Sequence, residues 1–185
     1  MNPLTFDGLV TQGDRAAWAV TSPGGAYRYA LGRCWEPLIP FEFDEDPLPV
    51  FSVFAINPSR ARHDVDDPTM RKLVHFAKQE GCGALLIRNL FAFSSVVPSE
   101  LLMAQDAVGE RNLEVLSLDI PGAIHVAAWG NLPNKRLRDL AEPSKAAIWA
   151  LPLQVFGLND GGEPKHPLYL ANKTRLMPWA KAAKS

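Results

Sequence analysis

The stretch VFSVFAINPSRARHDVDDPTM, residues Val50–Met70, contains a strand, a polar loop and the start of a helix. Its first part, Val50–Ile56, is an apolar run rich in β-branched and aromatic residues, which predicts a buried strand. Asn57 and Pro58 end this strand, because proline fixes its own φ and disfavours the helical region for the residue before it. The chain is therefore expected to turn at the carboxyl end of a buried strand.

A helix is predicted beyond the polar loop. Asp67 is a suitable N-cap, and Pro68 suits the first helical position because it has no N–H to leave unpaired. Apolar side chains then recur on one face, and Gly81 is a suitable stop, so we expect a helix over Pro68–Gln79. The loop before this helix carries several ionisable residues, namely Arg60, Arg62, His63, Asp64, Asp66 and Asp67.

This loop is a candidate for a binding site because of its place in the predicted sheet. In open α/β sheets, ligands bind outside the carboxyl ends of the strands. The alternative is an ordinary solvated connection between a strand and a helix. Such connections usually have about 2–6 residues, and this one is longer and rich in ionisable groups, which favours a functional role.

The composition is that of a soluble globular domain. The 185 residues are 47% hydrophobic and 21% charged, with a formal net charge of −1, which predicts no strong attraction to ordinary duplex DNA or to a membrane. No apolar run reaches transmembrane length, and the first residues lack the pattern of a secretory signal, so we expect a cytoplasmic protein. Cys34 and Cys82 lack metal-ligand spacing, so buried thiols are favoured over a disulfide, and no metal or cofactor is predicted.

The order of apolar runs and helical patterns predicts an α/β fold. Strands are expected around Ala16–Val20, Ala26–Trp35, Val50–Ile56, Ala84–Ile87, Ile124–Ala128 and Leu153–Phe156. Helices are expected over Pro68–Gln79, from Pro98, and over about Arg111–Leu118 and Pro133–Ala141. This alternation predicts a three-layer αβα sandwich with a mostly parallel central sheet. We expect one domain over residues 1–185, with a core of about 26–170 and peripheral segments at 1–25 and 171–185.

Polar residues follow four of the predicted strands. The four segments are Asn57-Pro58-Ser59, Arg88-Asn89-Leu90, Trp129-Gly130-Asn131 and His166-Pro167. Because the carboxyl ends of parallel strands meet at one edge of a sheet, we expect these segments to line one cleft, with Asn57, Asn89, Trp129 and His166 facing it. The convergence of four strand ends is stronger evidence for a site than any single motif.

The same motifs, in this order, resemble a known family. INPSxAxxxxDDPTxR, NLFA, AWG and HPLY lie between Tyr27 and Leu170 and are similar to a bacterial and phage family known only as a domain of unknown function. More distantly, their order is similar to that of the uracil-DNA glycosylase superfamily. That resemblance implies a uracil-DNA-glycosylase-like fold, a water-positioning loop at Asn57, reading of a base by Asn89 and stabilisation of the departing base by His166.

The chain departs from the glycosylase pattern at two places, and the second of them concerns the grip on DNA. The glycosylases usually have a glycine two residues before the Asp-Pro or Asn-Pro pair, whereas this chain has Ala55. Their last loop is usually His-Pro-Ser-Pro, whereas this chain has His166-Pro167-Leu168-Tyr169. Because the serine and second proline belong to the DNA-gripping loop of those enzymes, we expect weak or no binding to ordinary duplex DNA.

Three residues are predicted to carry the chemistry: Asn57, Asp66 and His166. The amide of Asn57 can hold and orient a water, and its alternative role is to cap the turn. In the cluster Asp64, Asp66 and Asp67, repulsion between carboxylates can raise the pKa of one of them and create a general base; for Asp67 the role of helix cap is favoured. His166 can donate a hydrogen bond to a developing anion, and its alternative role is structural.

A further group of residues is predicted to bind substrate. Arginines at this edge can hold a phosphate, and aromatic rings can stack on a base. The group comprises Pro58, Ser59, Arg60, Arg88, Asn89, Phe91 and Trp129. The ordinary alternatives are a solvated charged face for the arginines and a place in the hydrophobic core for the aromatic residues.

The leading hypothesis is an enzyme that binds a nucleobase-containing small molecule or a modified nucleic acid and hydrolyses an N-glycosidic bond. The first alternative is a non-catalytic nucleotide or nucleic-acid binding module. The second is a metal-dependent, phosphate-directed hydrolase in which Asp64, Asp66 and Asp67 hold Mg²⁺. Bound nucleotide without turnover would favour the first alternative, and metal dependence would favour the second.

Overall fold

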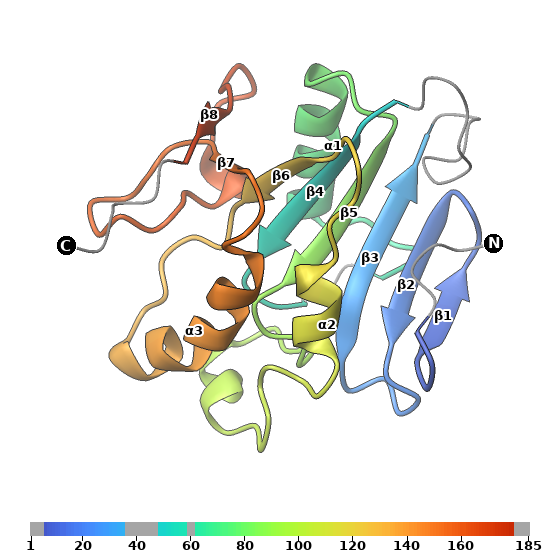
Figure 1. The fold of residues 1–185 in the computed structure, drawn as a ribbon, viewed down its shortest axis with the longest axis vertical. Helices are drawn as coiled ribbons and strands as arrows, with labels where there is room; N and C mark the ends of the chain where they lie inside the picture. Colours follow the sequence, from blue (N-terminus) through green and yellow to red (C-terminus); the bar gives the residue numbers. More distant parts are fainter. Residues whose placement is uncertain (1–5, 36–47, 59–61, 180–185) are drawn as a thin grey trace.

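Four parallel strands form the centre of one sheet in the computed structural model, which describes residues 6–35, 48–58 and 62–179 (Figure 1). They are β4 (Val50–Ala55), β5 (Ala84–Asn89), β6 (Ile124–Ala127) and β7 (Leu153–Val155). β4 pairs with both β5 and β6, and β6 pairs with β7. All four were predicted from their apolar runs, and their carboxyl ends point to the same edge of the sheet.

Antiparallel strands extend this sheet on both sides. β1 (Val10–Gly13), β2 (Ala17–Thr21) and β3 (Arg28–Cys34) form a meander whose last strand pairs with β5. β8 (Met177–Pro178) pairs with β7 on the other side. Short turns join β1, β2 and β3, and such turns can only link antiparallel neighbours, because parallel strands need a long crossover. The start of β3 therefore lies beside the carboxyl end of β5.

The predicted three-layer αβα sandwich with a mostly parallel, uracil-DNA-glycosylase-like sheet is wrong. In the described residues the sheet is mixed, with the order β1-β2-β3-β5-β4-β6-β7-β8. Three of its pairings are parallel and four are antiparallel. Local hydrophobic patterns identify strands but not the direction in which they pair. Segments near both ends of the chain add antiparallel strands that the alternating pattern of the middle does not contain.

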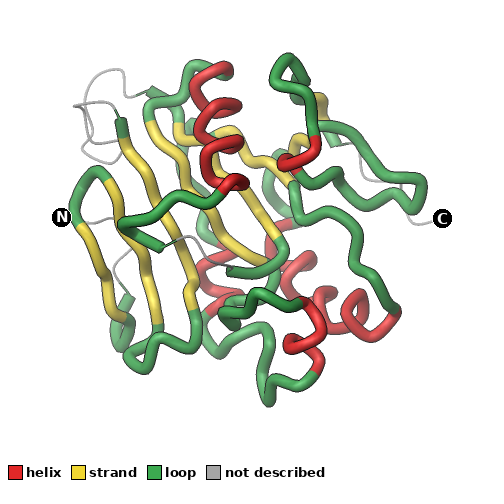
Figure 2. Tube along the Cα trace, turned by 180° about the vertical axis from the view of Figure 1, so that it is seen from behind, coloured by secondary structure: helices red, strands yellow, loops and turns green. Residues whose placement is uncertain are grey.

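Helices lie on both faces of this sheet (Figures 1 and 2). α1 (Pro68–Gln79) lies on one face, whereas α2 (Asn112–Ser117) and α3 (Lys135–Ile148) lie on the other. Two short 3₁₀ helices, η1 (Pro98–Leu102) and η2 (Pro167–Tyr169), lie in connecting segments. In the described part of the chain, no helix is long and apolar enough to cross a membrane.

The predicted bounds and cap of α1 are confirmed. The side chain of Asp67 accepts a hydrogen bond from the N–H of Met70 at 2.8 Å, and Gly81 follows the helix with a φ of +73°. Leu73 and Phe76 are fully buried against the strands. A local cap at each end and one apolar face are sufficient to specify this helix, which is why its sequence was informative.

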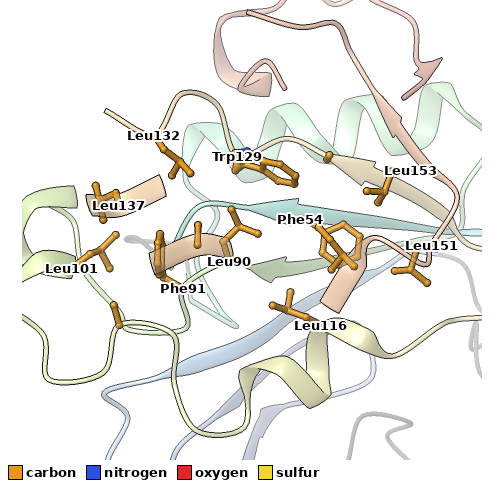
Figure 3. Close-up of a cluster of buried hydrophobic side chains, with 14 of the residues drawn as sticks. Phe54, Leu90, Phe91, Leu101, Leu116, Trp129, Leu132, Leu137, Leu151 and Leu153 are labelled. Atoms are coloured by element: carbon orange, nitrogen blue, oxygen red, sulfur yellow. The ribbon is translucent and has the colours of Figure 1, made fainter. Parts of the chain in front are cut away.

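The opposite face of the sheet carries a second hydrophobic core. Phe54, Leu90, Phe91 and Trp129 gather there beneath α3 (Figure 3). α3 extends beyond the predicted end at Ala141, although Pro143 lies inside it and removes one hydrogen-bond donor. Its buried residues include Ala141, Ser144 and Ile148, so tertiary packing continues past the proline and outweighs it. In the described part of the chain, Cys34 and Cys82 are not joined by a disulfide.

Candidate functional site

A small cavity lies at the carboxyl edge of the parallel strands, next to the start of α1. Its volume is about 120 Å³, and we call it the inner cavity. Asn57 follows β4, Asn89 ends β5, and His166 ends the loop after β7. These three line the cavity together with Arg28, Leu31, Ala55, Ile56, Asp67, Thr69, Met70, Leu73 and Ile87. Three of the four strand ends expected to converge therefore do so, whereas Trp129 is not among the lining residues.

The imidazole of His166 is held in one tautomer. The backbone N–H of Leu168 donates to Nδ1 at 3.3 Å, so the proton of the neutral ring belongs on Nε2. Burial lowers the pKa of His166 below its ordinary value, and the negative charge of Asp67 acts in the opposite direction. The ring is therefore neutral at about pH 7 and offers Nε2–H as a hydrogen-bond donor.

Asn57 offers an acceptor to the same site. Its Nδ2 donates to the carbonyls of Ser95 at 2.6 Å and Pro58 at 3.0 Å. Because both partners are carbonyls, they identify the amide nitrogen, and the oxygen Oδ1 must lie on the other side of the group. The two bonds also fix the turn after β4. The capping role and the role in a site are therefore compatible, since each uses a different atom of the amide.

Asn89 is the polar group whose environment points most directly to a ligand. Its side chain is buried, with 2% of its surface exposed. Within the described residues, its Nδ2 has no hydrogen-bond partner. A buried amide that lacks a partner costs about 1–3 kcal/mol, so such groups mark positions where a ligand or water completes the bonding.

Arg28 and Asp67 add opposite charges to the inner cavity. Arg28 begins β3 and is buried, and this burial lowers its pKa to about 10 while Asp67 acts in the opposite direction. The guanidinium therefore stays protonated at neutral pH. Asp67 lies at the start of α1, where its Oδ1 caps the helix. Its negative charge acts on both Arg28 and His166, which also line the cavity.

The other aspartates of the polar loop lie apart from one another. Asp66 forms an ion pair with Arg33 at 2.7 Å, and Asp64 forms one with Arg62 at 3.2 Å. Neither lines the inner cavity. Among the residues that the structure describes, no group of three His, Cys, Asp or Glu side chains is arranged to hold a metal ion. The carboxylate at the cavity is therefore Asp67 and not Asp66, which was the residue predicted to activate water.

Several residues predicted to bind substrate lie in the core. Arg88 is fully buried and donates to the carbonyls of Val115, Leu116 and Leu118 and to the hydroxyl of Ser52. Phe91 and Trp129 are part of the second core (Figure 3), and the indole N–H of Trp129 donates to Glu163. Pro58 is buried at the turn. Ser59 and Arg60 lie outside the described residues.

A second, larger hollow adjoins the first. Its volume is about 390 Å³, and we call it the outer cleft. It is lined by Gly130, Asn131, Asn159, Lys165, His166, Tyr169 and Leu170. His166 therefore lines both hollows. Gly130 permits this position, because its φ is +74° and a Cβ there would lie 3.1 Å from the Cβ of His166.

Sequence patterns did not indicate Arg28 or Lys165 as parts of a site, whereas Gly130 belongs to a segment that was expected to line the cleft. Arg28 reaches the cavity because β3 runs antiparallel to β5, which no local pattern reveals. Lys165 directly precedes the predicted His166, and its position in the loop was the available signal. The glycine of the AWG motif was visible in the sequence, but its contact with His166 joins residues that are far apart in the chain.

The fold and the two hollows define a mixed-sheet α/β protein with a candidate ligand site at the carboxyl ends of its parallel strands. The chain belongs to the family described as Protein of unknown function (DUF1643), whose model matches residues 28–168. This range nearly coincides with the motif-bearing segment between Tyr27 and Leu170. Neither the curated proteins nor the solved structures contain a significant match to the chain.

Proposed function

We propose that this protein binds a nucleobase in the inner cavity and hydrolyses the N-glycosidic bond between that base and a sugar. The observation that carries this proposal is the partly buried, neutral His166, whose Nε2–H is available at a cavity also lined by Asn57 and Asn89. A departing base acquires negative charge as the bond breaks. A preorganised donor binds this charge more strongly in the transition state than in the ground state, which is the condition for catalysis.

The dimensions and lining of the inner cavity favour a single base. Its volume of about 120 Å³ is smaller than the roughly 300–1,000 Å³ of sites that enclose a drug-sized ligand. The amide of Asn89 combines one donor and one acceptor, which is the arrangement that pairs with the edge of a base. Apolar side chains such as Leu31, Met70 and Ile87 offer contact surface to the faces of a ring.

In the proposed reaction, Asn57 holds a water through its Oδ1, and the water oxygen bonds to C1′ of the sugar. The C1′–N bond breaks, and its electron pair leaves with the base, where the Nε2–H of His166 stabilises the negative charge. The carboxylate of Asp67 stabilises the positive charge that develops on the sugar ring. The water's hydroxyl stays on C1′, and its proton reaches the base nitrogen through solvent. The products are a free base and a sugar with an anomeric hydroxyl.

The test is a mass-spectrometric screen for released base. The purified protein is incubated with nucleosides, nucleotides and oligonucleotides that contain modified bases. Release of one base by the wild-type protein, and its loss in the Asn57→Ala variant, would support the proposal. His75→Ala is a matched control, since His75 is an exposed residue of α1 that lines neither hollow. Tight binding of a nucleotide without any release would replace hydrolysis with a binding function.

A further inference from the structure

The outer cleft has the charge and shape of a second binding site. Its volume of about 390 Å³ falls within the range of roughly 300–1,000 Å³ that suits a drug-sized ligand. It adjoins the inner cavity at His166, which lines both. If the inner cavity holds the base and His166 acts at the bond being broken, the rest of the substrate extends into the outer cleft.

Lys165 gives this cleft a positive charge. In the described part of the chain, its Nζ forms no ion pair and no hydrogen bond, and no carboxylate is among the lining residues. Glu163, in the same loop, is bonded instead to Lys145 at 2.7 Å and to Trp129. An ammonium group without a neighbouring carboxylate favours an anionic ligand, and phosphate is a frequent partner of lysine.

Neutral polar side chains also line the outer cleft. Asn131 is exposed, and Tyr169 is 86% exposed, so the side chains of both can reach a ligand in the cleft. The amide of Asn159 is used within the loop, where it donates to the carbonyl of Pro164 at 3.3 Å. The loop is thus braced internally, while Lys165, Asn131 and Tyr169 remain available for the oxygens of a sugar phosphate.

We propose that the outer cleft binds the phosphate of a nucleoside monophosphate whose base occupies the inner cavity. This inference rests on the proposed function, because it uses the inner cavity as the base site and His166 as the residue between base and sugar. It names the substrate class: a nucleotide monomer is preferred over the nucleoside that lacks the phosphate. The same phosphate chemistry also occurs in single-stranded oligonucleotides, which therefore form a separate arm of the test.

The experiment compares kcat/KM for a nucleoside and for its 5′-monophosphate in the wild-type protein and in Lys165→Gln. We expect the wild type to prefer the monophosphate by about tenfold or more, as for hydrogen bonds to charged groups. Lys165→Gln should lose most of this preference, because its kcat/KM should fall much more for the monophosphate than for the nucleoside. Lys165→Arg should retain part of it. Lys173→Gln, a change at an exposed lysine that lines neither hollow, should leave the preference unchanged.

The outcomes separate the two proposals. Equal kcat/KM for nucleoside and monophosphate, with base release intact, would overturn the inference and leave the proposed function standing. A stronger preference for the oligonucleotide than for the monophosphate would overturn the choice of a monomer. If no substrate is cleaved, the proposed function fails. Calorimetric measurement of the affinities for nucleoside and monophosphate then tests whether the outer cleft binds phosphate. The inference would be overturned if the monophosphate bound no more tightly than the nucleoside. It would also be overturned if the monophosphate bound equally well to the wild type and to Lys165→Gln.

Discussion

His166 combines three properties that suit it to stabilise a leaving group. The N–H of Leu168 fixes its tautomer, burial keeps the ring neutral, and its position makes it part of both hollows. A neutral donor does not need to be protonated first. The neutral ring can therefore donate its hydrogen bond at every pH above its lowered pKa. An imidazolium donor would have lost its proton in that pH range.

The protonation of His125 and His166 gives a prediction for stability. Burial lowers the pKa of both His125 and His166 below the ordinary value of 6.5. Above this value both residues are neutral in the folded and unfolded chain. As the pH falls below 6.5, the unfolded chain takes up protons that the folded protein binds only at lower pH, so the free energy of unfolding must decrease.

Urea unfolding at a series of pH values checks this dependence. Each unit of pKa shift is worth about 1.4 kcal/mol once the pH lies below both pKa values. The His166→Gln variant should show a smaller loss of stability on acidification than the wild type, because its side chain does not titrate. If the free energy of unfolding depended on pH identically in the two proteins, the pKa of His166 would not be lowered by folding.

Asp67 has a structural role and a proposed electrostatic one, and two substitutions separate them. Asp67→Ala removes the cap of α1 and should cost about 1 kcal/mol of stability. Asp67→Ser keeps a capping oxygen but removes the charge, so it should be nearly as stable as the wild type and still release base more slowly. Urea unfolding and base-release rates are the measurements. Asn134→Ala, which removes the cap of α3, is the control: it should lose stability without a comparable loss of rate.

At the scale of elements, the sequence predicted what local chemistry specifies. The strands β4 to β7 are apolar runs, and α1 has a cap, a proline and a stop at defined positions. Contacts between residues far apart in the chain could not be predicted from local sequence patterns. Asp66 was predicted to be a catalytic carboxylate, but its partner is Arg33 of β3, which is 33 residues away in sequence. Phe91 and Trp129 follow strands in loops, where alternation no longer indicates which face a side chain occupies.

The contact between Gly130 and His166 gives a prediction about how loops support the site. Gly130 and Gly122 both have a φ of +74°, but only Gly130 lies against another residue where a Cβ would be added. An alanine at either position should cost about 1–2 kcal/mol because of the left-handed backbone. Gly130→Ala should cost more and should also slow base release, because the new Cβ displaces His166. Thermal unfolding and release rates test this, and equal effects of the two variants on the rate would contradict it.

At the scale of the whole molecule, the mixed sheet explains why β3 contributes Arg28 and Leu31 to the inner cavity. The N-terminal meander brings the buried Arg28 to the carboxyl edge of a parallel core. Net charge is −1, and the positive charge of the outer cleft comes from a single lysine. These features favour a small nucleotide over a long polyanion, whose binding requires many basic contacts.

Binding to ordinary duplex DNA should therefore be weak. Specific DNA-binding proteins reach about 10⁻⁸ M or tighter at physiological salt. We expect fluorescence anisotropy with a labelled unmodified duplex to give a far weaker affinity, which falls further as salt is raised. A nanomolar affinity that resists salt would be inconsistent with the small-nucleotide substrate proposed for the two hollows.

The most direct measurement is the rate of base release in a single turnover by the wild-type protein and by His166→Ala, alongside their affinities for the same substrate. Removing one donor to a developing anion typically lowers the rate by about 10²–10³-fold. We expect a loss of this size with little change in affinity, because the hydrogen bond strengthens mainly in the transition state. A His166→Ala protein that folds normally and releases base at the wild-type rate would leave this histidine structural and would contradict the proposed mechanism.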